Sequence, residues 1–189
     1  MRIFTLEHTR AAYLADFAIY AAAVLLLAAT LVAGTPRPQA AGCAALVVAG
    51  LGLWTVIEYA LHRFVLHGVP PFSGWHAQHH QRPTALIGSP TVLSALAIVL
   101  AFYVPAQLLG GVWRACALTL GVLVGYLLYA TIHHATHHWR SEAGWLLRRK
   151  RWHARHHQAG ARPARYGVTT AFWDHVFGST GARATGDPS

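Results

Sequence analysis

Charged residues are scarce in this chain. Asp, Glu, Lys and Arg together make up only 11% of its 189 residues, whereas a soluble domain carries about a quarter. Hydrophobic residues make up 54%, and they gather in stretches of about twenty, the length of a membrane-spanning helix. This composition excludes an ordinary soluble domain and indicates an integral membrane protein.

Cysteine is nearly absent as well. Cys43 and Cys116 each fall inside an apolar stretch, and neither has a C-x-x-C neighbour. The spacing therefore disfavours a disulfide framework or a thiolate metal site. We predict that both cysteines are buried as small hydrophobic residues.

Acidic residues are few, six against fifteen Lys and Arg, so the formal net charge is +9. The positions of the basic residues argue against a nucleic-acid partner. Only Arg37 and Arg114 fall in loops that we place on the far side of the membrane; the other thirteen lie near the N-terminus, in the middle loop or in the C-terminal third. This is the positive-inside bias, which matches an anionic leaflet. It predicts that both termini lie on the cytoplasmic side.

Four apolar stretches can be recognised, at residues 11–33, 40–61, 91–109 and 112–132. Prolines or a Gly-Gly pair separate the members of each pair of stretches, because these residues interrupt a helix. The first stretch is longer than the apolar core of a signal peptide, which favours a retained helix. We predict an all-α integral membrane bundle of about four transmembrane helices, with a helical cap on the cytosolic face.

We treat residues 1–189 as one domain. It comprises an N-terminal lead at 1–10, the transmembrane and histidine-rich part at 11–178, and a flexible tail at 179–189.

Histidine is abundant, and twelve of the fourteen histidines lie in clusters after the second and fourth stretches. A seven-residue phrase, W-H-A-x-H-H-Q, occurs twice, at residues 75–81 and 152–158. Since residues three and four apart share a helix face, each copy is predicted to aim three imidazoles at one point. Two such points side by side would make a metal site.

The number of candidate ligands bears on the number of ions. Some ten imidazoles exceed the four ligands that a closed zinc site takes, which favours two ions. Imidazole suits zinc, iron and copper alike, so ligand type does not name the metal. Neutral imidazoles that bind metal also avoid the repulsion between many protonated rings.

Other roles for the histidines stay open. A histidine-rich surface tract and a purely structural zinc site are the simplest. A bis-histidine haem protein needs pairs that face each other within the span, whereas these histidines follow the ends of the apolar stretches. The alternative to an enzyme is a non-catalytic membrane protein that binds metal or haem.

The order of the motifs is specific. H-x4-H, H-x-x-H-H, H-x3-H-H and H-x-x-H-H are followed by Y-G-V-T-T-x-x-W-D-x-x-F-G, all between Glu58 and Gly178. This order resembles the fatty acid hydroxylase and sterol desaturase superfamily of membrane di-iron oxygenases, with most likeness to its fatty acid 2-hydroxylase branch. The resemblance implies metal ligands at His62, His67, His76, His79, His80, His133, His137, His153, His156 and His157. It implies that His134 and His138 lie beside the ligands rather than among them.

The resemblance also implies a function. It is a non-haem di-iron, O2-dependent oxidoreductase that hydroxylates a C–H bond of a membrane lipid, above all a fatty acyl or sphingolipid chain. A sterol or carotenoid hydroxylase or desaturase is the alternative within the superfamily. The expected cofactors are two iron ions, for which zinc can substitute in purified protein, with O2 as co-substrate. The oligomeric state is left open.

Electrons have to come from outside this chain. Relatives often carry a fused haem-containing electron-transfer domain, for which this chain has no room, so we expect a separate electron-transfer protein. The basic segment from Arg148 to Arg155 is a candidate dock for it, or an anchor to anionic lipid.

Two carboxylates are candidates for supporting the ligands. Glu58 precedes His62 by four residues, so on a continuing helix it could accept a ring N–H. Asp174 is the second candidate. A helix cap or an ion pair with arginine is the competing role for each.

Overall fold

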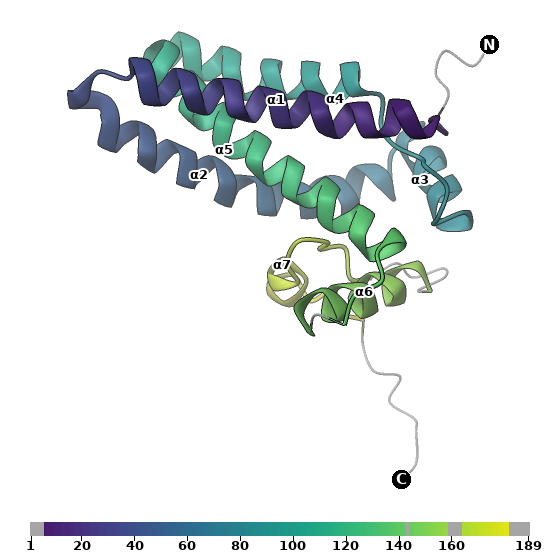
Figure 1. The fold of residues 1–189 in the computed structure, drawn as a ribbon. Helices are drawn as coiled ribbons and strands as arrows, with labels where there is room; N and C mark the ends of the chain where they lie inside the picture. The colour runs from purple at the N-terminus through teal and green to yellow at the C-terminus, as the bar shows by residue number, and fades with distance from the viewer. Residues whose placement is uncertain (1–5, 143, 159–163, 182–189) are drawn as a thin grey trace.

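The structure is a computed structural model that describes residues 6–142, 144–158 and 164–181. The remaining parts of the predicted lead and tail, residues 1–5 and 182–189, lie outside the described residues. The all-α prediction is confirmed: the described chain is helical apart from loops and one isolated bridge between Glu7 and Ile87. Figure 1 shows the elements in this order: α1 (Arg10–Gly34), η1 (Arg37–Gln39), α2 (Ala40–Ala60), η2 (Leu61–Leu66), α3 (Phe72–Gln81), α4 (Thr91–Ile98), η3 (Val99–Tyr103), α5 (Val104–His138), α6 (Gly144–His157) and α7 (Phe172–Val176).

Three continuous helical stretches are long and apolar enough to cross a membrane: Arg10–Gly34, Arg37–Leu66 and Thr91–His138. Many of their large side chains face outward, among them Val32, with 89% of its surface exposed, and Leu109 with 88%. Apolar surface of this kind belongs against lipid rather than water. The chain is therefore a membrane protein, as its composition predicts.

The third stretch is not a straight rod. Gly111 has φ 78° and ψ 176°, a conformation that glycine adopts readily and other residues do not. Ile98 and Val122 share one core cluster, although a straight helix would hold them about 36 Å apart. The chain thus turns back at Gly111 into two arms (Figure 1). The prediction of about four spans requires this geometry.

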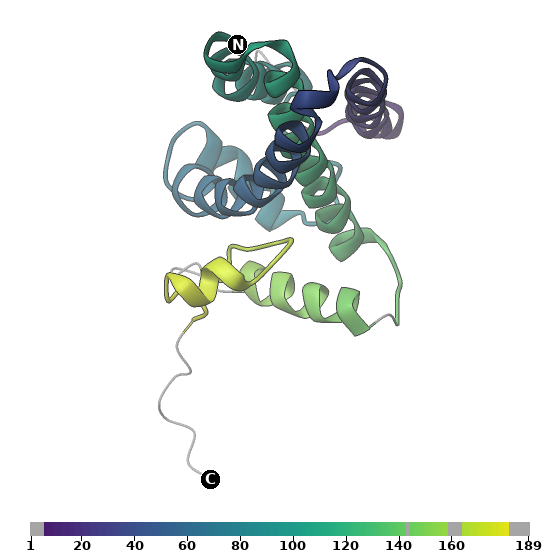
Figure 2. The same cartoon turned by 90° about the vertical axis from the view of Figure 1, so that its left-hand side faces the viewer.

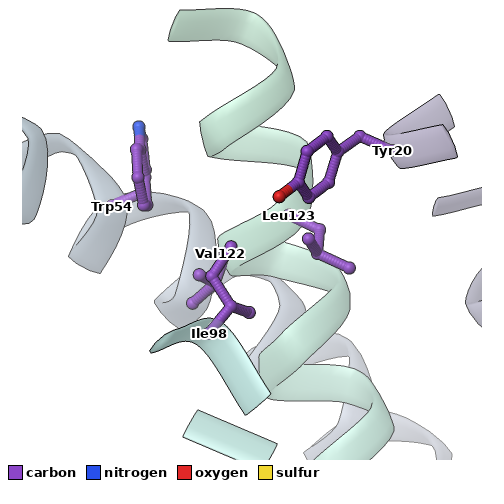
Figure 3. Packing of buried hydrophobic residues seen from close by; sticks show 5 residues of the cluster. All are labelled: Tyr20, Trp54, Ile98, Val122 and Leu123. Carbon is purple, nitrogen blue, oxygen red and sulfur yellow. The ribbon is translucent and has the colours of Figure 1, made fainter. Parts of the chain in front are cut away.

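The core lies where these helices meet around α5. Tyr20 of α1, Trp54 of α2 and Ile98 of α4 pack against Val122 and Leu123 of α5 (Figure 3). The side chains of Tyr20 and Trp54 reach this point from different helices, one on each side of α5. The cluster therefore joins α1, α2 and α4 to α5.

Glycines allow the two central helices to touch. A Cβ added at Gly121 of α5 would lie only 2.1 Å from the carbonyl oxygen of Val47 in α2. Small residues at helix contacts in membranes permit this close backbone approach. Cys43 and Cys116 are buried and free, so their prediction as buried small residues is confirmed.

The bundle has two distinct ends. At one end, the Trp113 side chain lies against Gly34, so the loop that carries Arg37 and the turn near Arg114 lie together. At the other end, α3 lies beside the ends of α1 and α2, and α6 and α7 lie below them (Figures 1 and 2); we call these three helices the cap. These three helices carry seven of the fourteen histidines.

Candidate metal centre

The end of the second stretch positions the H-x4-H motif. His62 lies in η2, a π-helical turn that ends at Leu66, and His67 follows it. On a regular α-helix, residues five apart point about 140° away from each other. A π-helical turn has hydrogen bonds between residues five apart, and it brings their side chains nearer to one face of the helix. The rings of His62 and His67 accordingly approach to 5.3 Å between centroids.

Five histidines bring their ligand atoms within 4.8 Å of one another at this point, and we call them the first cluster: His62, His67, His76, His80 and His156. Their Nε2 atoms converge. His76 Nε2 lies 3.0 Å from those of both His62 and His80, and His156 Nε2 lies 3.1 Å from those of both His67 and His80. Two nitrogens bound at right angles to one ion at about 2.1 Å lie about 3.0 Å apart. The spacing fits a common metal ion.

A second cluster lies beside the first. His79, His133, His137 and His153 bring their ligand atoms within 4.8 Å of one another. His157 adjoins this group, with its Nε2 atom 3.1 Å from that of His153. Both ring nitrogens of His79 are buried and have no hydrogen-bond partner in the described part of the chain. A buried imidazole without a partner is costly, and a metal ion would supply one.

The two H-x-x-H-H motifs divide their histidines between the clusters. His76 and His80 belong to the first cluster, whereas His79 belongs to the second; in the other copy, His156 belongs to the first and His153 to the second. The prediction that each copy aims three imidazoles at one point is therefore wrong. On a helix the third and fourth following residues point about 100° apart, so neighbouring histidines serve different clusters. Each half of the chain thus contributes to both.

Backbone carbonyls orient two of the rings. His62 Nδ1 donates to the carbonyl oxygen of Tyr166 at 2.5 Å, and His156 Nδ1 donates to that of Ala164 at 2.8 Å. Since a carbonyl only accepts, Nδ1 carries the proton and the Nε2 lone pair faces the first cluster. The sequence did not reveal these acceptors, because a backbone carbonyl leaves no trace in residue type.

Glu58 holds the loop that provides these carbonyls. Its Oε1 accepts from the backbone N–H groups of Val168 and Thr169 at 2.7 and 2.9 Å, and its Oε2 accepts from the Thr169 hydroxyl at 2.5 Å. The carboxylate is thus engaged by the loop rather than by a ring N–H of His62. Its support of the histidine is indirect, through the position of Tyr166.

Asp174 grips the same loop from the other side. It is fully buried, and it accepts hydrogen bonds from the backbone N–H groups of Tyr166 at 2.8 Å and Gly167 at 2.9 Å. Ser179 Oγ donates at 2.8 Å and Trp152 Nε1 at 3.3 Å. Residues 166–174, which carry the Y-G-V-T-T-x-x-W-D phrase, thus hold the Tyr166 carbonyl in position, and we call this segment the terminal clamp.

His134 and His138 lie outside both clusters. Their rings stack on each other at 4.4 Å, and His134 Nδ1 lies 3.2 Å from the Tyr13 hydroxyl of α1. They therefore occupy the side of α5 that faces α1. His175 stacks on Trp152 at 5.8 Å and is also outside the clusters.

Burial keeps the clustered rings neutral. Desolvation, reinforced by neighbouring histidines, lowers the pKa of His79 to about 2 and that of His157 to about 3. For His67, at the edge of the first cluster, desolvation lowers the pKa to about 4. At neutral pH these imidazoles thus present lone pairs rather than protons, as metal ligands must.

A largely apolar cavity of about 520 Å³ leads to the clusters. Its walls include Trp54, Trp75 and Phe102, and His62 and His133 lie at its histidine end. Its volume is typical of a small-molecule site. Residues of both clusters therefore border one apolar cavity.

Comparisons with known proteins agree with this arrangement. A sequence model of the fatty acid hydroxylase family matches residues 47–179. The chain belongs to the fatty acid hydroxylase family. The match begins in α2 and covers the nine histidines of the two clusters and the adjoining His157.

Several relatives of this family are known by function. The chain is 33% identical to a ceramide very long chain fatty acid hydroxylase from Schizosaccharomyces pombe, over 71% of this chain and 42% of that protein. It is 32% identical to a dihydroceramide fatty acyl 2-hydroxylase from Arabidopsis thaliana, over 71% of this chain and 60% of that protein. It is 32% identical to a fatty acid 2-hydroxylase from Rattus norvegicus, over 70% of this chain and 38% of that protein. The chain thus spans about half the length of these relatives.

The fold is shared with a solved hydroxylase domain. In a structure of full-length scs7p, only the hydroxylase domain is visible, and it superimposes on 92% of this chain and 67% of that one with a TM-score of 0.76. The sequences are 24% identical. This likeness supports the helical architecture of the bundle and its cap.

Proposed function

We propose that this chain is a lipid hydroxylase that holds two metal ions. The first ion is bound by His62, His67, His76, His80 and His156, and the second by His79, His133, His137, His153 and His157. The observation that carries the proposal is the pair of adjacent imidazole clusters at the end of one apolar cavity.

The proposed metal is iron. Bound iron would supply the capacity to activate O2 with two external electrons and to place a hydroxyl group on an unactivated C–H bond. The chain's own residues bind and orient the substrate, and the apolar walls exclude water that would intercept the oxidising equivalents. The carbonyls of Tyr166 and Ala164 hold the protons on Nδ1 of His62 and His156, so that Nε2 stays available.

The substrate is proposed to be a fatty acyl or sphingolipid chain. The relatives are named for action on fatty acyl groups and ceramides, and the cavity is largely apolar. A chain of methylene groups would lie in it with one C–H bond near the histidines.

Electrons are proposed to come from a separate protein at the cytoplasmic side. Arg148, Arg151 and Arg155 are exposed on α6, the helix that also carries His153 and His156. A basic surface over the histidines suits an acidic electron-transfer partner, which electrostatic attraction would bring to this face.

The experiment combines metal analysis with lipid profiling. The chain is purified without a histidine tag or added metal, and metal per chain is measured beside the visible spectrum. Two irons per chain and no intense haem band are expected. Cells that express the chain should contain hydroxylated acyl chains absent from control cells, whereas new double bonds would identify a desaturase.

A matched pair of variants locates the site. His156→Ala should lower bound metal and abolish product, whereas His175→Ala, outside the clusters, should retain both. Folded protein without bound metal, or a haem spectrum, would refute the proposal.

A further inference from the structure

Asp16 is an acidic residue in the apolar helix α1, and it lines the cavity that leads to the histidines. An ionisable side chain inside a membrane helix is costly and is a functional-site candidate by default. Thr91 Oγ1 donates a hydrogen bond to Asp16 Oδ1. Within the described residues, Asp16 Oδ2 has no hydrogen-bond partner. Asp16 also forms no ion pair there, since the ion pair among these residues joins Arg82 to Glu7. The cavity wall thus offers a carboxylate oxygen without a cation.

The same cavity has a donor on another wall. Trp54 of α2 is buried and lines the cavity, and its Nε1–H has no partner in the described part of the chain. Figure 3 shows Trp54 and Tyr20 around α5. The Tyr20 hydroxyl lies 2.7 Å from Ser94 Oγ, so these two hydroxyl groups already bond each other. Asp16 Oδ2 therefore remains as an acceptor for a ligand that donates a hydrogen bond.

Asp16 lies near the level of the clusters. On α1 it falls between Tyr13, which contacts His134, and Tyr20, whose ring is 4.6 Å from that of Tyr126. On α5 the step from Tyr126 to His133 corresponds to about 10 Å along the axis. Along the helix axes, Asp16 therefore lies between the levels of Tyr126 and His134, and it lines the same cavity as His62 and His133.

We propose that Asp16 is a specificity-determining residue that binds a neutral, hydrogen-bond-donating group of the lipid substrate, an amide N–H or a hydroxyl, and rejects a free carboxylate. This inference rests on the proposed function. A hydrogen bond to a charged group is stronger than one between neutral groups, and two carboxylates repel each other strongly in a medium of low dielectric constant. Amide-linked acyl chains are favoured over free fatty acids.

Asp16 also has a simpler structural role, because its bond to Thr91 links α1 to α4 and polar pairs stabilise helix contacts in membranes. A structural role alone would alter stability without altering the choice between lipids. The test therefore measures that choice.

Three lipids with the same acyl chain separate the properties of the head group. Hexadecanamide is neutral and donates hydrogen bonds, methyl hexadecanoate is neutral and donates none, and hexadecanoic acid is an anion. The full-length protein is incubated with equal amounts of all three, and bound lipid is quantified by native mass spectrometry. The amide should exceed the other two by about tenfold, the worth of one hydrogen bond to a charged group.

Asp16→Asn should reduce the preference for the amide over the acid by about tenfold or more, since the new amide group can donate to a carboxylate. Glu7→Gln is the matched control, because Glu7 is exposed in its pair with Arg82, and it should keep the wild-type ratio. An unchanged ratio in Asp16→Asn would overturn the proposal.

If Asp16→Asn does not fold, the wild-type protein still decides, since binding of the methyl ester equal to that of the amide would also overturn it. The readout is independent of turnover. Altered lipid choice in a protein that forms no product would sink the proposed function alone, and turnover with unaltered choice would sink this inference alone.

Discussion

Asp174→Asn tests whether the terminal clamp supports the first cluster. In the wild-type protein, Asp174 Oδ2 accepts from Gly167 N–H at 2.9 Å and from Trp152 Nε1–H at 3.3 Å. In the better orientation of the variant's amide, its oxygen keeps these two donors and its nitrogen faces the Tyr166 N–H and the Ser179 hydroxyl. The hydroxyl can turn and accept, so one buried backbone donor loses its acceptor. Such a donor costs about 1–3 kcal/mol, and the unfolding free energy should fall by about that amount.

The same change should weaken metal binding. The loop displaced by the variant carries the Tyr166 carbonyl that orients His62, and loss of such support typically lowers metal affinity by about 10–100-fold. Denaturant unfolding of the metal-free protein measures the first effect, and competition with a chelator measures the second. Glu142→Gln, at an exposed position, is the matched acid-to-amide control. Wild-type stability and metal affinity in Asp174→Asn would show that the clamp does not support the cluster.

Three further changes have defined outcomes. Gly121→Ala should cost about 3 kcal/mol or more through overpacking, because its Cβ meets a backbone carbonyl of α2, whereas Gly52→Ala, with nothing within 4 Å, should not destabilise; thermal unfolding in detergent compares them. His79→Ala should reduce bound metal from two ions per chain to one, whereas His138→Ala should keep both, as measured by elemental analysis. Burial lowers the pKa of His156 to about 3, so the unfolded metal-free chain binds more protons than the folded one, and stability should fall as pH drops from about 6.5 towards 3; a pH series of unfolding midpoints that stays flat would contradict this.

The sequence alone determined the class of the protein and the inventory of its site. Long apolar stretches can be satisfied only by helices in a membrane, so the four stretches and the Gly110-Gly111 turn predicted the helical bundle and its reversal. The order of the histidine motifs resembles the fatty acid hydroxylase family, and that resemblance implied the ten residues that the structure gathers into two adjacent groups. These features are local in the chain, and local patterns survive in residue order.

Only the tertiary structure decided how the histidines are shared. Which cluster His79 or His156 joins depends on how α3 and α6 rotate against the ends of α2 and α5, and no helix carries that information by itself. The sequence also did not predict the partners of Glu58 and Asp174, because both carboxylates accept from backbone N–H groups, which every residue type except proline carries. Glu58 binds a group 110 residues away in the sequence, and Asp174 binds one 8 residues away. Hydrogen bonds and metal sites depend on distances of a few ångströms, and those distances exist only once the separate segments have packed together.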